Sequence, residues 1–370
     1  MSTYAGDGIA ASNRDGNAAT AASIDSPFGI WLDTADNLYM AESGDSCKVR
    51  KVTASTGLVS TFAGQASGCG DAAAGDAGQA TSATFTSVRY IWGDSNNELY
   101  IVDTLWHTVR KVSSTGIISH FAGDAGGFAG GRGDGGQATD ARLNTPTSVG
   151  GDTNGNIYIT PFTQGKVRHV DGATGIITSL AYTNTVDGST SASFGGPYGV
   201  FVDSTGSVYV TEMTDNKVRR VDATTNLIST IVGVGSAGDA GIGGAATSAE
   251  LDSPIYSWAD TVGNLFVADR LNRKIKHVSI ETGLIEVVAG TGTDAYSGDG
   301  GLATSADLEL ARGIWGTSSG EIFFADSKSS VVRRLTAASF ETTISPTELP
   351  TFSPTAVPST ASPTPTDSAA

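Results

Sequence analysis

The sequence predicts an all-β protein with the architecture of a six-bladed β-propeller, in which the N-terminal strand closes the last blade. Three observations carry this prediction. One phrase recurs six times, each complete copy holds four short strand-like runs, and the last copy lacks its fourth run. Internal repeats are considered first because they decide the architecture of the whole chain.

Each copy of the repeat contains a marker residue that ends its first run. The markers are Asp33, Asp94, Asp152, Asp203, Asp260 and Thr317, at spacings of 51 to 61 residues. The runs are rich in β-branched and aromatic residues, and turn residues such as Gly206 and Asn264 separate them. Four-stranded meanders at a fixed period are typical of propeller blades, which pack radially around an axis.

The first residues of the chain match the run that the last copy lacks. The sixth copy has three strand-like runs, near residues 313–315, 321–325 and 331–335, and the pattern then stops. Residues 2–6 (Ser-Thr-Tyr-Ala-Gly) match residues 60–64 (Ser-Thr-Phe-Ala-Gly) position by position. We therefore expect residues 2–5 to form the outer strand of the last blade, because a closed ring leaves no exposed sheet edge.

The repeat phrase resembles that of the NHL family. The resemblance rests on the Asp-x-x-x-Asn-Leu-Tyr-x-Ala-Asp/Glu pattern that begins at Asp33 and on the Val-Arg-Lys-Val run 49–52. The long connections 133–143 and 298–308 resemble a subtype seen in teneurins and many bacterial NHL proteins. The resemblance covers residues 2 to about 336 and implies a propeller domain over residues 1–340. It implies no particular activity, because one fold hosts many functions.

The last 30 residues, 341–370, differ in composition from the repeats. They hold 13 Ser or Thr and six of the chain's eleven Pro. Such a segment cannot bury enough apolar surface to fold, so we expect a disordered tail. Its composition resembles that of an O-glycosylated stalk, and a plain flexible linker remains the alternative.

The overall charge and hydropathy limit the classes of partner. The formal net charge of −16 disfavours nonspecific binding to nucleic acid, which depends on neutralising phosphates. No apolar run approaches 18 residues, so no membrane span is expected. Residues 2–6 already belong to a strand and leave no room for a secretory signal before it. The expected location is extracellular or at the cell surface for a processed form, and cytoplasmic if no signal peptide lies upstream.

Most basic residues belong to the third run of each copy and are expected to be structural. We expect them to pair with the acid that ends the second run, namely Glu42, Asp103, Glu212, Asp269 or Asp326. The Gly-Asp-Gly connections offer about one carboxylate each, whereas calcium loops offer three or four. Their aspartates, Asp76, Asp134, Asp239 and Asp299, are therefore expected to cap turns through their own backbone.

The sequence predicts no catalytic residue, cofactor or metal site. The four histidines, His107, His120, His169 and His277, do not have the spacing of metal ligands. The two cysteines, Cys47 and Cys69, flank antiparallel runs of the first copy, although Cys69 lies about five residues too far along the chain. A disulfide and two free thiols are both open, and a disulfide would favour an oxidising compartment.

Aromatic residues recur two positions before the marker. The set is Trp31, Trp92, Gly150, Phe201, Trp258 and Trp315. A ring of packing residues around the axis is the expected arrangement, with a ring that stacks on a ligand as the alternative. Gly150 should leave a gap in the third blade, and Pro161 should distort that blade because proline cannot donate to a strand ladder.

Five positions before the marker, where the first strand begins, the residues vary most. They are Phe28, Arg89, Thr147, Tyr198, Ile255 and Arg312. Shared residues are used by blade packing, so varied ones at one mouth of a central channel are candidates for recognition. Phe28, Arg89, Tyr198 and Arg312 together predict a binding surface for an anionic or peptide partner. The alternative is that both arginines pair with loop aspartates.

These observations predict a non-catalytic, monomeric binding or scaffold propeller that contacts a protein or a glycan. A structural repeat unit of a surface protein is compatible with this reading. The alternative is a hydrolase or lactonase type of enzyme with a metal in the channel. That alternative requires carboxylates or Asn on several first strands, where the sequence has mostly apolar residues or Gly.

Overall fold

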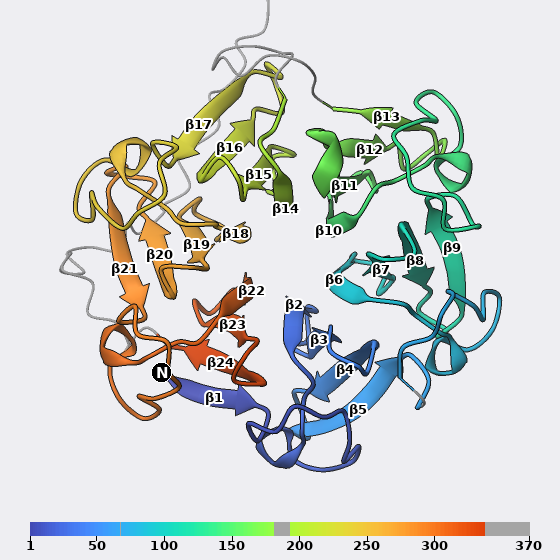
Figure 1. Cartoon of the computed structure of the whole chain (residues 1–370), viewed down its shortest axis with the longest axis horizontal. Helices are drawn as coiled ribbons and strands as arrows, with labels where there is room; N and C mark the ends of the chain where they lie inside the picture. Colours follow the sequence, from blue (N-terminus) through green and yellow to red (C-terminus); the bar gives the residue numbers. More distant parts are fainter. Residues whose placement is uncertain (67, 181–192, 337–370) are drawn as a thin grey trace, which may run out of the picture.

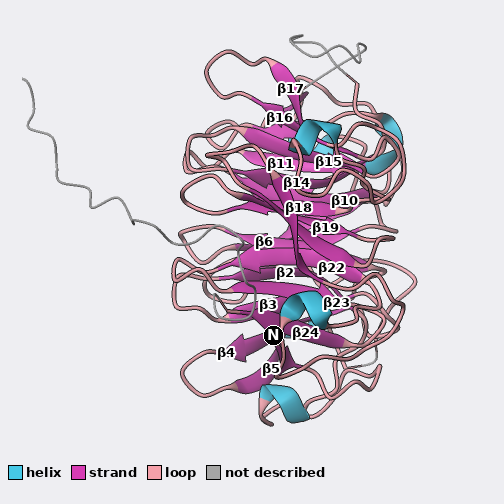
Figure 2. Ribbon diagram, turned by 90° about the vertical axis from the view of Figure 1, so that its left-hand side faces the viewer, coloured by secondary structure: helices cyan, strands magenta, loops and turns pink. Residues whose placement is uncertain are grey.

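The computed structural model describes residues 1–66, 68–180 and 193–336. Its 24 strands form six four-stranded antiparallel sheets, which are arranged as blades around one axis (Figure 1). Figure 2 shows the same ring from the side. The predicted all-β six-bladed propeller is therefore confirmed. The predicted tail 341–370 lies outside the described residues.

Each blade is a meander whose first strand is innermost and whose last strand is outermost. Blades 1 to 3 comprise β2 (Pro27–Leu32), β3 (Leu38–Glu42), β4 (Lys48–Thr53), β5 (Leu58–Ala63); β6 (Val88–Gly93), β7 (Leu99–Asp103), β8 (Thr108–Val112), β9 (Ile118–Ala122); β10 (Pro146–Gly151), β11 (Ile157–Pro161), β12 (Arg168–Val170) and β13 (Ile177–Ser179). Blades 4 to 6 comprise β14 (Pro197–Val202), β15 (Val208–Glu212), β16 (Lys217–Val221), β17 (Ile228–Val232); β18 (Tyr256–Ala259), β19 (Leu265–Asp269), β20 (Lys274–Val278), β21 (Ile285–Ala289); β22 (Ala311–Gly316), β23 (Ile322–Asp326), β24 (Val331–Leu335) and β1 (Ser2–Ala5).

The helical content is confined to single turns in the described part of the chain. These 3-10 turns are η1 (Ala19–Ala21), η2 (Ala80–Ser82), η3 (Ala138–Asp140), η4 (Phe162–Gln164), η5 (Ala246–Ser248) and η6 (Ala303–Ser305). None of the helices described is long or apolar enough to span a membrane.

The N-terminal strand β1 closes blade 6, as the sequence predicts. It pairs antiparallel with β24, with Thr3 opposite Arg333. The terminal ammonium group of Met1 donates to the Gly301 carbonyl at 2.9 Å, and the Tyr4 ring packs edge-on against Phe323 at 4.9 Å. The N-terminal strand and the last strand of the described residues therefore share one sheet, so that the ring has no open edge at this point.

The marker aspartates explain why the first two strands of a blade turn where they do. Asp33 Oδ1 accepts hydrogen bonds from the backbone N–H groups of Ala35 and Asn37, both at 2.9 Å. Asp94, Asp152, Asp203 and Asp260 bond to their own turns in the same way. The conserved spacing of the repeat phrase is thus the spacing of an Asx turn.

Each blade buries a cation at the same position of its third strand. These side chains are Arg50, Arg110, Arg168, Arg219, Lys276 and Arg333, all between 0 and 3% exposed. Pairing with the acid that ends the second strand is observed for Arg50 with Glu42 (3.3 Å), Lys276 with Asp269 (2.7 Å), Arg219 with Glu212 (3.8 Å) and Arg333 with Asp326 (4.0 Å).

The prediction for the loop aspartates is wrong. They do not cap their own turns but bind the buried cation of the blade that follows. The pairs are Asp76 with Arg110 (2.7 Å), Asp134 with Arg168 (2.7 Å), Asp239 with Lys276 (2.9 Å) and Asp299 with Arg333 (2.7 Å). The physical reason is that a buried guanidinium or ammonium group is costly unless it is paired and hydrogen-bonded.

Blade 3 matches its sequence-based expectation, and the state of the two cysteines, which the sequence left open, is defined. Blade 3 is distorted, since β12 and β13 contain three residues each and Pro161 occupies the place of the acid. Cys47 and Cys69 form a disulfide with their Cα atoms 4.9 Å apart. The bond ties the start of β4 to the loop that follows β5.

Candidate binding site on the propeller axis

The six innermost strands bring their side chains together in three layers along the axis. We call the side where these strands begin the mouth, and the side of the marker residues the far face. The layers lie five, four and two positions before the marker. We call them the mouth layer, the middle layer and the tryptophan layer.

A repeated backbone irregularity points two consecutive residues at the axis. In blade 1, Pro27 pairs with Glu42 but Ile30 pairs with Met40, so the first strand has one extra residue. The same shift occurs between the first two strands of blades 2, 3, 4 and 6. A β-bulge of this kind bends the strand and redirects a side chain, and bulges are frequent at the rims of barrels and beside sites.

The middle layer closes the axis. The rings of Tyr90 and Tyr256 stack with centroids 4.4 Å apart, and both residues are 2% exposed. Glycines of the preceding blades make room for them, because a Cβ on Gly29 would lie 2.6 Å from Tyr90 and one on Gly199 would lie 2.8 Å from Tyr256. Burial raises the pKa of both phenols above the usual range.

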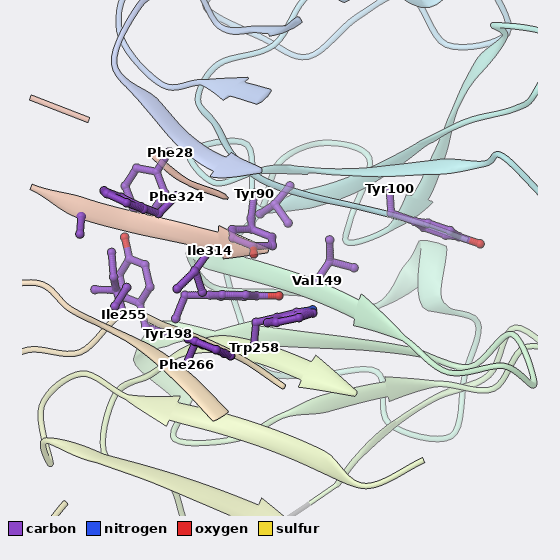
Figure 3. Close-up of a cluster of buried hydrophobic side chains, with 14 of the residues drawn as sticks. Phe28, Tyr90, Tyr100, Val149, Tyr198, Ile255, Trp258, Phe266, Ile314 and Phe324 are labelled. Atoms are coloured by element: carbon purple, nitrogen blue, oxygen red, sulfur yellow. The ribbon is translucent and has the colours of Figure 1, made fainter. Parts of the chain in front are cut away.

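The expectation of a central channel is therefore wrong at this depth. The space bounded by Phe28, Tyr90, Tyr198 and Tyr256 does not admit a water-sized molecule. Figure 3 shows Phe28, Tyr90, Tyr198 and Ile255, which come from four different blades, converging in this cluster. A ligand can reach the mouth layer from outside but cannot pass through the ring.

The mouth layer brings together the four residues that the sequence selects. Phe28 is 3% exposed and stacks with Tyr198 at 6.1 Å between ring centroids. The guanidinium carbons of Arg312 and Arg89 lie 4.0 and 5.2 Å from the centre of the Phe28 ring. Arg89 also donates a hydrogen bond to the Tyr198 hydroxyl at 3.1 Å. Two cations and two aromatic rings thus meet at one point.

The two arginines lack the acidic partners that the alternative requires. Within residues 1–66, 68–180 and 193–336, no carboxylate oxygen lies within 4 Å of the guanidinium group of Arg89 or Arg312, and Arg312 donates no hydrogen bond. The buried arginines on the third strands, in contrast, have acidic partners. Arg50, for example, contacts both Asp15 and Glu42.

Two further residues lie at the mouth and were not predicted from the sequence. Arg270 directly follows β19, and its charge acts on Arg312. Phe162 directly follows β11 and packs edge-on against Tyr198 at 5.7 Å. Both occupy the position after the second-strand acid, where the six blades have Ser43, Thr104, Phe162, Met213, Arg270 and Ser327. The variation that selected the mouth layer is present here too, and would have identified both residues.

The clustering of charge affects Arg312. Burial lowers the pKa of Arg312 to about 10, and the positive charges of Arg270 and Arg89 lower it as well, whereas Tyr198 opposes the change. At neutral pH the side chain is still protonated. The mouth therefore carries three positive charges on a chain whose net charge is −16.

The tryptophan layer is a packing ring. Trp258 and Trp315 lie 6.4 Å apart, and Phe201 contacts both. Trp31, Trp92 and Trp258 each cover a glycine of an adjacent blade, namely Gly93, Gly151 and Gly316. A far-face pocket of about 190 Å³ lies beside this layer, lined by Trp92, Asp94, Asp152 and Asp203 among others. Gly150 does not line this pocket, and the gap expected at Gly150 stays a prediction.

The histidines have structural contacts. His107 Nδ1 accepts a hydrogen bond from the Thr145 N–H group, His277 pairs with Glu286, and His169 packs on Tyr158. Across the residues that the structure describes, no group of three His, Cys, Asp or Glu side chains is placed to hold a metal ion.

Comparisons with known proteins give one sequence relative of low identity. No protein-family model matches the chain. Protein SUPPRESSOR OF QUENCHING 1, chloroplastic, from Arabidopsis thaliana is 25% identical over 256 residues. The match spans 64% of this chain and 24% of that protein, so this chain corresponds to about a quarter of the relative.

Solved structures show the same fold. An auxiliary nutrient binding protein from Bacteroides ovatus has a TM-score of 0.62 at 15% identity, covering 90% of this chain and 75% of its own. Virginiamycin B lyase from Staphylococcus aureus has a TM-score of 0.51 at 13% identity, covering 83% and 93%. A gluconolactonase from Xanthomonas campestris has a TM-score of 0.52 at 12% identity, covering 84% of each chain. At these identities the likeness concerns the fold alone.

Proposed function

We propose that the protein is a non-catalytic binding propeller that contacts a protein or glycan partner through the mouth of its axis. The observation that carries this proposal is the meeting of Arg89 and Arg312 on Phe28 without an acidic partner among the described residues. Tyr198 completes the proposed site. The fold similarity to an auxiliary nutrient binding protein agrees with a binding role.

The energetics support a ligand at this point. Removing a cation from water costs free energy unless a partner compensates for it. The fold does not require a cation here, because blades 3 and 5 have Thr147 and Ile255 at the same position. Two arginines that the repeat does not need, held together without a counter-charge, are best accounted for by an anionic group on a partner.

A hydrolase or lactonase activity is the competing function, and the lyase and gluconolactonase of similar fold are the reason to consider it. An enzyme of that type needs carboxylates or Asn around the axis. The positions in question hold Phe28, Tyr90, Tyr198 and Tyr256, whose rings fill the space. The aromatic closure of the axis therefore favours binding over catalysis.

The wider setting of the site is part of the proposal. We infer a propeller of the NHL-repeat type over residues 1–340, followed by a Ser/Thr/Pro-rich spacer over residues 341–370. The disulfide between Cys47 and Cys69 favours an extracellular or cell-surface location, since disulfides persist in oxidising compartments. The net charge disfavours nucleic acid as the partner, and a monomer is expected.

The proposal is tested by binding to glycan and peptide arrays. We expect the variant Arg89→Ala/Arg312→Ala to keep its circular dichroism spectrum and to lose binding by at least about tenfold. Two control variants, Arg132→Ala on an exposed loop and Val262→Asp on the exposed far face, should bind like the wild type. Unchanged binding of the double variant, or turnover of lactone or ester substrates that depends on the mouth, would refute the proposal.

A further inference from the structure

We propose that the mouth binds a compact dianionic group, a phosphate monoester or two closely spaced carboxylates, between Arg89, Arg270 and Arg312. This inference rests on the proposed function above and names the chemistry that the same site recognises. It adds Arg270 to the site.

The three cations come from three blades. Arg89 lies on β6 of blade 2 and Arg312 on β22 of blade 6, and these two blades flank the Phe28 of blade 1. Arg270 directly follows β19, the second strand of blade 5, which returns to the mouth side because first and second strands are antiparallel. All three side chains are partly exposed, so that a solute can reach them.

Their donors are not used by the protein. In the described part of the chain, none of the three has a carboxylate within 4 Å, and the hydrogen bond from Arg89 to Tyr198 is the one bond that the three guanidinium groups make. The Nε atoms of Arg89, Arg270 and Arg312 are buried without a partner. The Nε atoms of Arg50 and Arg333, on the third strands, also lack a partner, but the terminal nitrogens of both side chains are bonded, as in Arg50 with Asp15 and Arg333 with Asp299. The mouth thus holds preplaced donors with no acceptor.

The shape of the site selects a compact group. The axis below is closed by Tyr90 and Tyr256, so the ligand must present its anionic end to the mouth from outside. A guanidinium fork binds two oxygens of a phosphate or carboxylate at once. A single carboxylate would leave two of three positive charges uncompensated, whereas a dianion would leave one.

The field of the whole molecule adds selectivity. The far ends of the first strands carry Asp33, Asp94, Asp152, Asp203 and Asp260. These aspartates lie five residues beyond the mouth layer, which is about 16 Å along a strand at 3.3 Å per residue. The innermost strands thus carry arginines at the mouth and aspartates at the far face, and the second-strand acids on the mouth side are paired with buried cations in four blades. This arrangement favours the approach of a small anion at the mouth. The net charge of −16 repels long polyanions that would have to cover more than the mouth.

The test is isothermal titration of the full chain with inorganic phosphate and, separately, with succinate, at constant ionic strength. We expect saturable binding of at least one of the two, at least tenfold tighter than that of acetate. Binding of phosphate alone identifies a phosphate monoester as the source, and binding of succinate alone identifies paired carboxylates. Arg270→Gln and Arg312→Gln should each weaken binding at least tenfold, and Arg312→Lys should weaken it less. Arg132→Gln is the control for loss of one charge and should bind like the wild type.

The unliganded variants provide a second readout. Arg312→Gln removes the repulsion of Arg312 by Arg89 and Arg270 and the cost of burying the charge of Arg312. This variant should therefore melt at the same temperature as the wild type or higher. A lower melting temperature with unchanged phosphate and succinate binding would make the arginine structural and overturn the inference. Absence of saturable binding of both dianions would also overturn it, even if array ligands still bind through the mouth and the proposed function survives. If Arg132→Gln weakens anion binding equally, the binding depends on the overall charge of the protein and not on a site at the mouth.

Discussion

Tyr90 and Tyr256 stack across the propeller axis at 4.4 Å between ring centroids, although they belong to blades 2 and 5 on opposite sides of the ring. Phe28 and Tyr198 form a second such pair between blades 1 and 4. Opposite blades are thus joined by aromatic contacts in addition to the contacts between neighbours. The axis is part of the hydrophobic core. A partner can therefore contact only the mouth, where the axis meets solvent.

Replacing the Tyr256 ring should therefore affect stability like a core substitution. We expect Tyr256→Ala to lower the free energy of unfolding by about 3–5 kcal/mol, the range for large aromatic side chains in cores. Urea denaturation measures this change. Phe128→Ala, at a residue that is 59% exposed, is the control and should cost much less. A loss below about 1 kcal/mol for Tyr256→Ala would show that the axis is not packed in this way.

The repeat pattern predicts contacts within a blade far better than contacts between blades. The closing strand at residues 2–5 and the four mouth residues followed from comparing equivalent positions of six copies. The stacking of Tyr90 on Tyr256 did not, because it joins different copies across the axis. The ion pairs of Asp76, Asp134 and Asp299 were missed for a related reason. Each joins an aspartate to a cation 34 residues later, in the next blade.

Removing the closing strand should destabilise the whole ring. Deletion of residues 1–8 removes the pairing of β1 with β24, the bond from Met1 to Gly301 and the contact of Tyr4 with Phe323. It also exposes one edge of blade 6. We expect the melting temperature to fall by about 10 °C or more, as measured by calorimetry. Tyr4→Ala should cause a smaller fall, and an unchanged melting temperature after deletion would contradict this topology.

The disulfide should contribute measurably to stability. Cys47 and Cys69 are separated by 22 residues, and closing a loop of this length in the unfolded chain is worth about 3 kcal/mol in the chain-entropy model. Cys47→Ser/Cys69→Ser should lose that amount in urea denaturation without a change of fold. Intact mass after alkylation under non-reducing conditions should show no modified cysteine in material made in an oxidising compartment. Two alkylated cysteines there would contradict the bond.

Metal chelation should leave the ring intact. The aspartates of the Gly-Asp-Gly loops are engaged by cations of the next blade, as Asp299 is by Arg333. A carboxylate held in this way is not free to coordinate calcium. EDTA should therefore shift the melting temperature by less than about 2 °C, which corresponds to at most about 1.5 kcal/mol for a ring of this size. A larger loss that added calcium restores would show that the loops bind metal.

The pH dependence of stability should reveal the buried acid of blade 1. Burial raises the pKa of Glu42 to about 7, although the charge of Arg50 opposes this change. A carboxyl group with a folded-state pKa above its unfolded value stabilises the protein at acidic pH, and this contribution is lost as pH rises through about 7. Glu42→Gln replaces the group by a neutral amide of similar shape and removes that dependence.

The stability of Glu42→Gln relative to the wild type should consequently increase from pH 4.5 to pH 8, by about 2–3 kcal/mol at most. Arg50 keeps its second partner Asp15 in this variant, so its charge is not left unpaired. Urea denaturation at several pH values measures the difference, and the exposed Glu281→Gln serves as the control. A difference that is constant with pH, or that falls as pH rises, would show that the pKa of Glu42 is not raised in the folded state, because the charge of Arg50 offsets the burial.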